Sequence, residues 1–420
     1  MSPVAPPPLS EAGTALVAEV ISRLQGVVPE DRRPALLHEP SLRGTRAWEY
    51  TRECLDSNWI STAGAFVERF ERQLAEITGA ADAVAVVNGT CALHLALEVG
   101  GVEPGDEVLC PAISFVATAN AIRHAGALPH FVDVEEGTLG LDPEALERRL
   151  EEVAELQRDG CRNRVTGRRL KALVPVHVFG NPCQIERLVE IAARWRLEVV
   201  EDSAEALGSW RDGRHPGLFG RVGILSFNGN KIVSTGGGGA LITHDPELAR
   251  RARHLSTTAK RPHPWEYEHD AVGYNYRLPN PNAALGCAQL EVLDQLLELK
   301  RTLANRYVAA LEGLDGISVF PEPAGTRRNE WLVALVLDAP DMALRDALLA
   351  ALADAGLQSR PVWKPLHLLA PYRDAPRGPL PVTESLHARV INPPSSASLV
   401  GEVSAPPQRP PSDDANGSRP

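Results

Sequence analysis

Lys231 is the residue whose sequence context best fits covalent chemistry. It follows an apolar stretch at 222–227 and precedes the glycine run at 236–239, so it does not belong to a polar helix face. Removing an amine from water favours its neutral, nucleophilic form, which can form an imine with a carbonyl compound. A solvated loop lysine is the common alternative for any single lysine. The assignment therefore depends on which other groups lie nearby.

Two further stretches offer such groups. Asn88-Gly89-Thr90 joins a predicted strand to a predicted helix, where a small turn, a hydroxyl and free backbone amides favour an anion such as phosphate. Taken alone, this turn is more simply an ordinary capped helix start. Asp202 directly follows an apolar strand, and in open α/β sheets ligands bind beyond the carboxyl ends of the strands. A helix N-cap explains Asp202 equally well.

An anion site, a strand-end carboxylate and a desolvated lysine are together the groups that pyridoxal phosphate (PLP) requires. They would serve as phosphate anchor, partner of the pyridine nitrogen and Schiff-base amine. The glycine run is not a nucleotide loop, because G-x-x-x-x-G-K-[ST] is absent and no G-x-G-x-x-G follows a strand. Glu201, next to Asp202, is expected to be solvated. The hypothesis from the residues is a PLP enzyme.

The elements that must position these groups alternate between apolar strands and amphipathic helices, which is typical of a mainly parallel sheet covered by helices. A long helical pattern at 285–311 leads to a smaller α+β domain at 316–392, with a strand at 331–337 and a helix at 344–356. In the large domain, strands are predicted at 83–87, 107–110, 128–132, 173–178, 197–201 and 222–227, and helices at 91–99, 116–124 and 185–196.

Composition excludes several classes of function. The formal net charge of −11 argues against nucleic-acid binding, which needs a concentrated basic face. The scattered cysteines form no C-x-x-C pair, so neither a disulfide framework nor a metal site is indicated. The N-terminus lacks the pattern of a secretory signal, and no apolar run is long enough to cross a bilayer. A cytoplasmic enzyme without membrane or nucleic-acid partners is expected, with a polar tail at 396–420 predicted to be disordered.

The order of motifs resembles the DegT/DnrJ/EryC1/StrS family of sugar aminotransferases, and within it the LegC-like branch. The resemblance covers residues 38–396 and rests on NWISTAGAFVERFE, NGTCALHLAL, GDEVLCPAISFVATANAI, FVDVEEGTLGLDP, VVEDSAEALGS, SFNGNKIVSTGGGGAL, GYNYRLPNPNAALG and RPVWKPLHLL. It implies the α/β fold type I of PLP-dependent transferases, similar to aspartate aminotransferase, with a mainly parallel seven-stranded sheet. The implied division is an N-terminal extension with a helix (1–37), a large PLP-binding domain (38–300) and a small C-terminal domain (301–395).

The resemblance also implies roles for individual residues. Lys231 matches the Schiff-base lysine and Asp202 the acid that pairs with the pyridine nitrogen, while Phe115 matches the aromatic residue stacked on the cofactor ring. Asn275 matches a residue that reaches the phosphate of the neighbouring subunit, which implies a homodimer with shared active sites. The remaining matches are Thr90 and Cys91 in the phosphate-binding turn, Ser226 and Asn228 before the lysine, Glu205 near the phenolic oxygen, and Trp59, Arg277 and His367 as weaker candidates for substrate contacts.

The activity implied is transfer of an amino group from glutamate, which leaves as 2-oxoglutarate, to a 4-keto-6-deoxy nucleotide-linked hexosamine. Such a step would serve the biosynthesis of surface polysaccharides or of nonulosonic-acid type sugars. Other keto sugars, including 3-keto and secondary-metabolite deoxysugars, and a non-catalytic scaffold member remain alternatives. A dehydratase of the same fold carries histidine in place of the lysine, and Lys231 argues against it. The chain departs from relatives at Asn228, where many have His or Tyr, and beyond INPPSS, where a polar tail replaces their final helix.

Overall fold

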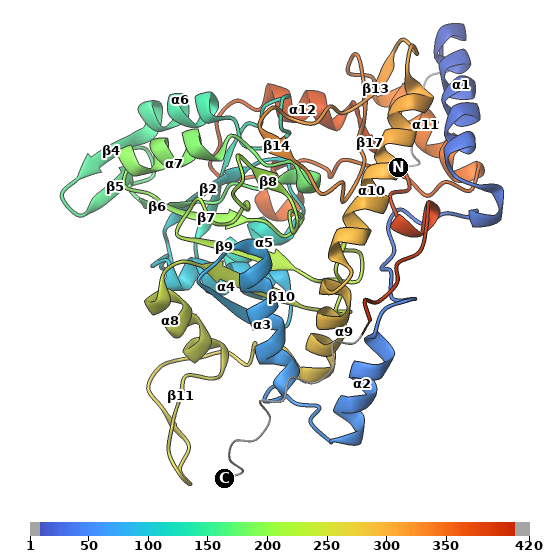
Figure 1. Ribbon diagram of the computed structural model, residues 1–420. Helices are drawn as coiled ribbons and strands as arrows, with labels where there is room; N and C mark the ends of the chain where they lie inside the picture. Colours follow the sequence, from blue (N-terminus) through green and yellow to red (C-terminus); the bar gives the residue numbers. More distant parts are fainter. Residues whose placement is uncertain (1–8, 408–420) are drawn as a thin grey trace.

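The computed structural model describes residues 9–407, and its centre is a nine-stranded sheet (Figure 1). Seven strands form its main path, in the order β1 (Asp82–Val86), β10 (Gly239–Thr243), β9 (Val222–Ser226), β7 (Glu198–Asp202), β6 (Arg169–Leu173), β2 (Glu107–Pro111) and β3 (Leu128–Val132). From β9 to β3 all neighbours are parallel, and β10 is antiparallel to both of its neighbours. The hairpin of β4 (Ala154–Gln157) and β5 (Gly160–Asn163) extends β6. The predicted mainly parallel sheet is confirmed.

Helices cover both faces of this sheet because successive strand residues point to opposite sides. In β1, Ala83 and Ala85 pack into the same cluster as Phe70 of α3, whereas Val84 and Val86 pack with α4. The helices of the large domain are α2 (Ala47–Asp56), α3 (Ala65–Thr78), α4 (Gly89–Val99), α5 (Ala117–His124), α6 (Pro143–Val153), α7 (Ile185–Arg194), α8 (Pro246–Ser256) and α9 (Asn280–Leu290). A short hairpin of β11 (Lys260–Arg261) and β12 (Glu268–His269) projects beyond α8 (Figure 1).

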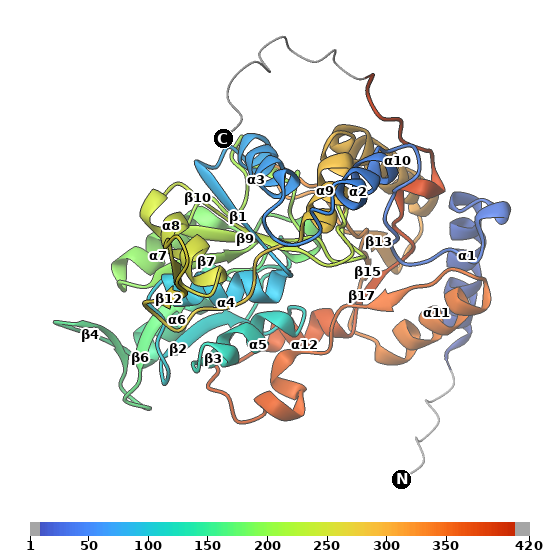
Figure 2. The same ribbon diagram turned by 90° about the horizontal axis from the view of Figure 1, so that it is seen from below.

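The small domain is built on a four-stranded antiparallel sheet reached through α10 (Leu293–Leu311). Its strands run in the order β13 (Ile317–Val319), β15 (Leu335–Leu337), β17 (Val390–Asn392) and β16 (Arg360–Pro361), accompanied by helices α11 (Met342–Asp354) and α12 (Pro381–His387). A separate pair of β14 (Thr326–Arg327) with β8 (Trp210–Arg211) links it to the large domain. Helix α1 (Glu11–Val27) lies against α10 and α11, and its Leu24 belongs to the small-domain core (Figure 2).

Three elements differ from the sequence-based boundaries by more than two residues. The single helix predicted at 285–311 is two helices, α9 and α10, separated at Glu291 and Val292. The strand predicted at 173–178 lies earlier, at Arg169–Leu173, and the strand predicted at 331–337 is ordered as strand only from Leu335. The apolar residues after Leu173 and before Leu335 are buried but pair with neighbouring strands only at isolated positions, such as Val176 with Asp202, and a sequence pattern does not distinguish them from strands.

The expectation of a disordered tail from residue 396 is wrong for residues 396–407. Leu399 and Val403 are buried, and the backbone N–H of Ser404 donates to Gln295 Oε1 at 2.9 Å. Two apolar side chains spaced along a polar stretch are enough to dock it on α10, although the composition is that of a solvated tail. Residues 408–420, the rest of that predicted tail, lie outside the described residues. We propose a domain boundary near residue 300, where the core shared with α1 begins.

Membrane-spanning helices, metal sites and cysteines were considered across the described residues. Within residues 9–407, no helix is long and apolar enough to cross a membrane. Across the same residues no group of His, Cys, Asp and Glu side chains is arranged to hold a metal ion. The six cysteines are free thiols, five of them buried.

Candidate active site

A cavity of about 370 Å³ lies at the carboxyl ends of β7 and β9, where the sequence places its candidate residues. The register pairs Asp202 with Ile224, so the ends of the two strands lie side by side. Of the predicted site residues, the cavity is lined by Thr90, Phe115, Asp202, Glu205, Ser226, Asn228 and Lys231. Segments far apart in the sequence thus meet in one site, as the strand-end rule predicts.

The Asn88-Gly89-Thr90 turn begins helix α4 and packs tightly against β9. The Asn88 side chain caps the helix by accepting from the Cys91 N–H at 2.8 Å. A Cβ on Gly89 would lie 2.9 Å from Ser226 Cβ, so only glycine allows this approach. The first turn of α4 therefore presents free backbone N–H groups and the Thr90 hydroxyl to the cavity, which is the chemistry of a phosphate site.

Asp202 lies at the floor of the cavity and is 6% exposed. Thr118 Oγ1 donates to Asp202 Oδ2 at 2.8 Å, and Thr118 is itself hydrogen-bonded to Ser114 at 2.7 Å. Burial raises the pKa of Asp202, and the Thr118 hydroxyl opposes that shift. A buried carboxylate aimed at a cavity calls for a cationic partner, and a protonated ring nitrogen meets this need. The sequence pattern did not indicate Thr118 and Ser114. Both follow the end of β2, and both line the cavity.

The Lys231 amine lies between a carboxylate and an aromatic ring. Its Nζ is 3.3 Å from Glu205 Oε1 and 3.7 Å from the centre of the Trp331 ring. The second oxygen of Glu205 accepts from the Phe179 N–H at 2.8 Å. Burial raises the pKa of Glu205, while the nearby Lys231 amine lowers it. Sequence analysis did not find Trp331, because it arrives from the small domain and carries no local motif.

The residues present fit PLP as cofactor. Phe115 is 55% exposed at the cavity wall, which an aromatic ring tolerates when another flat ring covers it. The cavity also supplies an amine at Lys231, a buried acid at Asp202 and free N–H groups at the start of α4. These match the aldehyde, the ring nitrogen and the phosphate of the cofactor.

The expectation that Glu201 is solvated is wrong. Glu201 is fully buried, and its carboxylate accepts from the backbone N–H groups of Gly217 at 2.8 Å and Gly220 at 2.6 Å. Its Oε2 is also 3.1 Å from His177 Nε2. The Cys183 N–H donates to the other ring nitrogen of His177 at 3.2 Å, so a neutral imidazole donates from Nε2 to Glu201. Glu201 thereby fixes the loop that follows β8, a role that only the folded chain reveals.

The other predicted residues do not line the cavity. Cys91 lies just behind the turn, and Arg277 forms an ion pair with Glu71. His367 is buried with Nε2 3.5 Å from Glu384, while Trp59 is 57% exposed. Asn275 is exposed, and its backbone forms an isolated antiparallel β-bridge with Thr257. For these residues, contacts with substrate or with a neighbouring subunit stay predictions.

Known proteins share both the sequence and the fold. EpsN from Bacillus subtilis (strain 168), named as a pyridoxal phosphate-dependent aminotransferase, is 43% identical over 331 residues, which are 79% of this chain and 82% of that protein. GDP-perosamine synthase from Escherichia coli O157:H7 is 37% identical over 87% of this chain and 94% of its own. The aminotransferase TlmJ from Streptoalloteichus hindustanus superposes with a TM-score of 0.77 at 33% identity, covering 86% of this chain and 93% of that one.

The sequence profile of the DegT/DnrJ/EryC1/StrS aminotransferase family matches residues 43–404, which include every residue that lines the cavity. The relatives, the fold type I architecture and the groups in the cavity agree with one another. This chain therefore belongs to the DegT/DnrJ/EryC1/StrS aminotransferase family and is a PLP-dependent aminotransferase.

Proposed function

We propose that this sugar aminotransferase transfers the amino group of glutamate to C4 of a 4-keto-6-deoxy nucleotide-linked hexosamine. The observation that carries the proposal is the meeting of Lys231, Asp202 and the start of α4 in one cavity. When bound, PLP supplies an electron-withdrawing ring that stabilises negative charge on the carbon that loses a proton. The remaining tasks fall to side chains of this chain.

Lys231 is assigned two tasks. Its Nζ would hold the cofactor through the aldehyde carbon between turnovers, and as a free amine it would move a proton at the substrate carbon. The amine lies inside the cavity with its neighbours Glu205 and Trp331, so it stays close to the reacting atoms after release. Such proximity is worth several orders of magnitude in rate for a proton transfer.

Asp202 and Phe115 would hold the cofactor ring. The Asp202 carboxylate would keep a proton on the pyridine nitrogen, and the Thr118 hydroxyl orients that carboxylate. Phe115 would cover the cofactor ring, and the amides at Gly89 and Thr90 would hold its phosphate. Glu205, whose pKa is raised by burial, lies at the Lys231 amine and would share a proton with that amine or with the phenolic oxygen of the cofactor.

The nucleotide-linked substrate is supported by the relatives. One is named GDP-perosamine synthase, and the structure of DesI, with a TM-score of 0.76 at 30% identity, was determined with its TDP-sugar product. Amination at C4 within the LegC-like branch follows from the motif resemblance. A different keto position is the alternative for the substrate. A non-catalytic scaffold is disfavoured because the cavity keeps its amine, acid and anion site together.

A homodimer with shared sites is part of the proposal. Asn275 is exposed at the base of the β11–β12 hairpin, outside the cavity of its own chain. The same hairpin region exposes Trp265 at 78%, Tyr267 at 78% and Val272 at 86%. Large apolar side chains exposed on one projecting segment are typical of a contact surface. We infer that this segment reaches the site of a second copy, where Asn275 contacts the cofactor phosphate.

The experiment loads the protein with PLP and incubates it with glutamate and a panel of 4-keto and 3-keto deoxysugar nucleotides, with amination detected by mass. We expect product from 4-keto-6-deoxy hexosamine nucleotides, and Lys231→Ala should lose both the visible cofactor absorbance band and turnover. Lys364→Ala, which changes an exposed lysine, serves as the control. Full turnover by Lys231→Ala would rule out the assigned lysine, and product only from 3-keto sugars would rule out the assigned position.

A further inference from the structure

Trp331 contacts the Lys231 segment at two points. The face of its indole ring lies under the Lys231 amine, with Nζ 3.7 Å from the ring centre. Its Nε1–H donates to the backbone carbonyl of Asn230 at 2.7 Å, one residue before the lysine. The indole is 4% exposed and lines the cavity. One side chain thus fixes both the chain at residue 230 and the direction of the amine.

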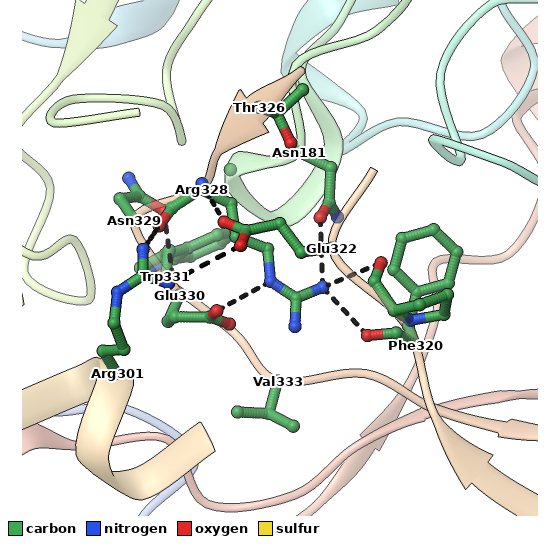
Figure 3. Close-up of polar contacts among 12 residues, drawn as sticks. Asn181, Arg301, Phe320, Glu322, Thr326, Arg328, Asn329, Glu330, Trp331 and Val333 are labelled. Carbon is green, nitrogen blue, oxygen red and sulfur yellow. Dashed lines mark hydrogen bonds and ion pairs between the residues drawn. The ribbon is translucent and has the colours of Figure 1, made fainter. Parts of the chain in front are cut away.

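The backbone that carries Trp331 is held by a buried polar network around Arg328 (Figure 3). The Arg328 guanidinium donates to Glu330 Oε1 at 2.8 Å and to the carbonyl of Phe320 at 2.9 Å, and it is 3.4 Å from Asn181 Oδ1. Arg301 in turn donates to the Arg328 carbonyl at 3.0 Å. We call residues 328–331 the strap, because they join the small domain to the cavity wall.

The strap is also attached to the large domain beside the cavity. Asn329 Nδ2 donates to the carbonyls of Glu205 at 2.7 Å and Leu207 at 2.9 Å, and Asn329 Oδ1 accepts from the Trp331 N–H at 3.0 Å. The backbone of Glu205 and the ring of Trp331 are therefore fixed by the same amide side chain. These two residues flank the Lys231 amine on different sides.

The strap adopts a costly conformation. Glu330 has φ of 53°, in the left-handed region that non-glycine residues avoid, and its side chain is buried. Such a conformation is strained and persists only where the surroundings enforce it. Lys300, also buried, donates to the Trp331 carbonyl at 3.0 Å and to that of Ser395 at 2.6 Å. The polar groups that enforce the strap act on Trp331 itself and on the residues next to it.

We propose that Trp331 is a positioning residue for Lys231: its indole face and its Nε1–H hold the amine toward the reacting atoms whenever the lysine is not bound to the cofactor. The face of an indole attracts an ammonium group, and the attraction is strongest where water is excluded. The hydrogen bonds around Arg328 hold the segment of the small domain that carries this ring. The inference rests on the proposed role of Lys231 and adds a residue that acts through it.

The test compares Trp331→Leu, which removes the ring, with Trp331→Phe, which keeps an aromatic face but loses the Nε1–H. We expect Trp331→Leu to lower kcat by about tenfold, with KM for glutamate changed much less, and Trp331→Phe to recover most of the loss. Trp195→Leu is the control, because Trp195 is a half-buried tryptophan packed in a different core cluster. Circular dichroism and the cofactor absorbance band check folding and loading.

A second measurement uses the protein without PLP. Acylation by a water-soluble acetyl ester is followed by mass spectrometry of the peptide containing Lys231, with the exposed Lys364 as internal reference. Trp331→Leu should raise the ratio of the Lys231 acylation rate to the Lys364 acylation rate by about tenfold, and Trp331→Phe should raise this ratio less. The inference is overturned if Trp331→Leu leaves both acylation and kcat as in the wild type, or lowers kcat without changing acylation. Failure of the proposed function shows instead in Lys231→Ala keeping turnover, so the two failures are distinguishable.

Discussion

Replacing Lys300 with methionine is expected to remove a pH-dependent part of the stability of this protein. The Lys300 side chain is 1% exposed and its amine donates to two backbone carbonyls, while no carboxylate within residues 9–407 lies at hydrogen-bond distance from it. Burial lowers the pKa of Lys300 from 10.5 to about 7. Between these two pH values the unfolded chain binds more protons than the folded chain, so the free energy of unfolding rises with pH.

The magnitude follows from the size of the shift. One pKa unit corresponds to about 1.4 kcal/mol, so the free energy of unfolding should rise by at most about 1.4 kcal/mol per pH unit in this window. From about pH 7.5 to about pH 9.5 the expected gain is therefore about 2 to 3 kcal/mol. Lys300→Met lacks the titrating group and has none of this gain, although it also leaves the Trp331 and Ser395 carbonyls unpaired at every pH.

The assay is urea unfolding of the cofactor-free protein at about pH 7.5, 8.5 and 9.5, followed by circular dichroism. The measured quantity is the stability of the wild type minus that of Lys300→Met, because other titrating groups cancel in this difference. It should increase steadily with pH, whereas the difference between the wild type and the exposed-site control Lys364→Met should stay flat. A wild-type minus Lys300→Met difference that is constant within about 0.5 kcal/mol would refute the reasoning.

Three further outcomes are expected. Thr118→Val removes the hydroxyl that donates to Asp202 and should lower kcat/KM by about tenfold or more in steady-state kinetics, since hydrogen bonds to charged groups contribute about 1.5–3 kcal/mol; unchanged kinetics would contradict the role of that bond. Gly89→Ala places a Cβ 2.9 Å from Ser226 Cβ and should weaken PLP binding by about tenfold in a spectral titration, with little change if the turn does not hold the phosphate. Leu399→Ala should cost about 2–3 kcal/mol in urea unfolding because the side chain is buried, whereas a disordered tail would show no effect.

Several features were predictable because they depend on local sequence. Apolar strands that end in polar residues place those residues at one edge of a parallel sheet, so the residue pattern alone assigns Asp202 and the Asn88–Thr90 turn to a common cleft. Lys231 stood out because an apolar strand and a glycine run flank it. The motif order extended this assignment to the family and to the activity.

Other features could not be predicted because they depend on contacts between distant segments. The burial of Glu201 depends on a loop that returns to it at Gly217 and Gly220. The ordered course of residues 396–407 depends on the surface offered by α10, which composition does not reveal. A local pattern carries no information on such pairings, since they are set by how the elements pack.

By itself the sequence determined the sheet, the strand-end acid and the lysine, because hydrophobic periodicity and turn chemistry act over a few residues. Only the tertiary structure decided what surrounds the amine. Glu205 reaches Lys231 from the segment after β7, and Trp331 reaches it from the small domain, 100 positions further along the chain. The physical reason is that burial, hydrogen bonding and cation–π contact act across space, so the chemistry of Lys231 is set by neighbours that the order of residues does not place beside it.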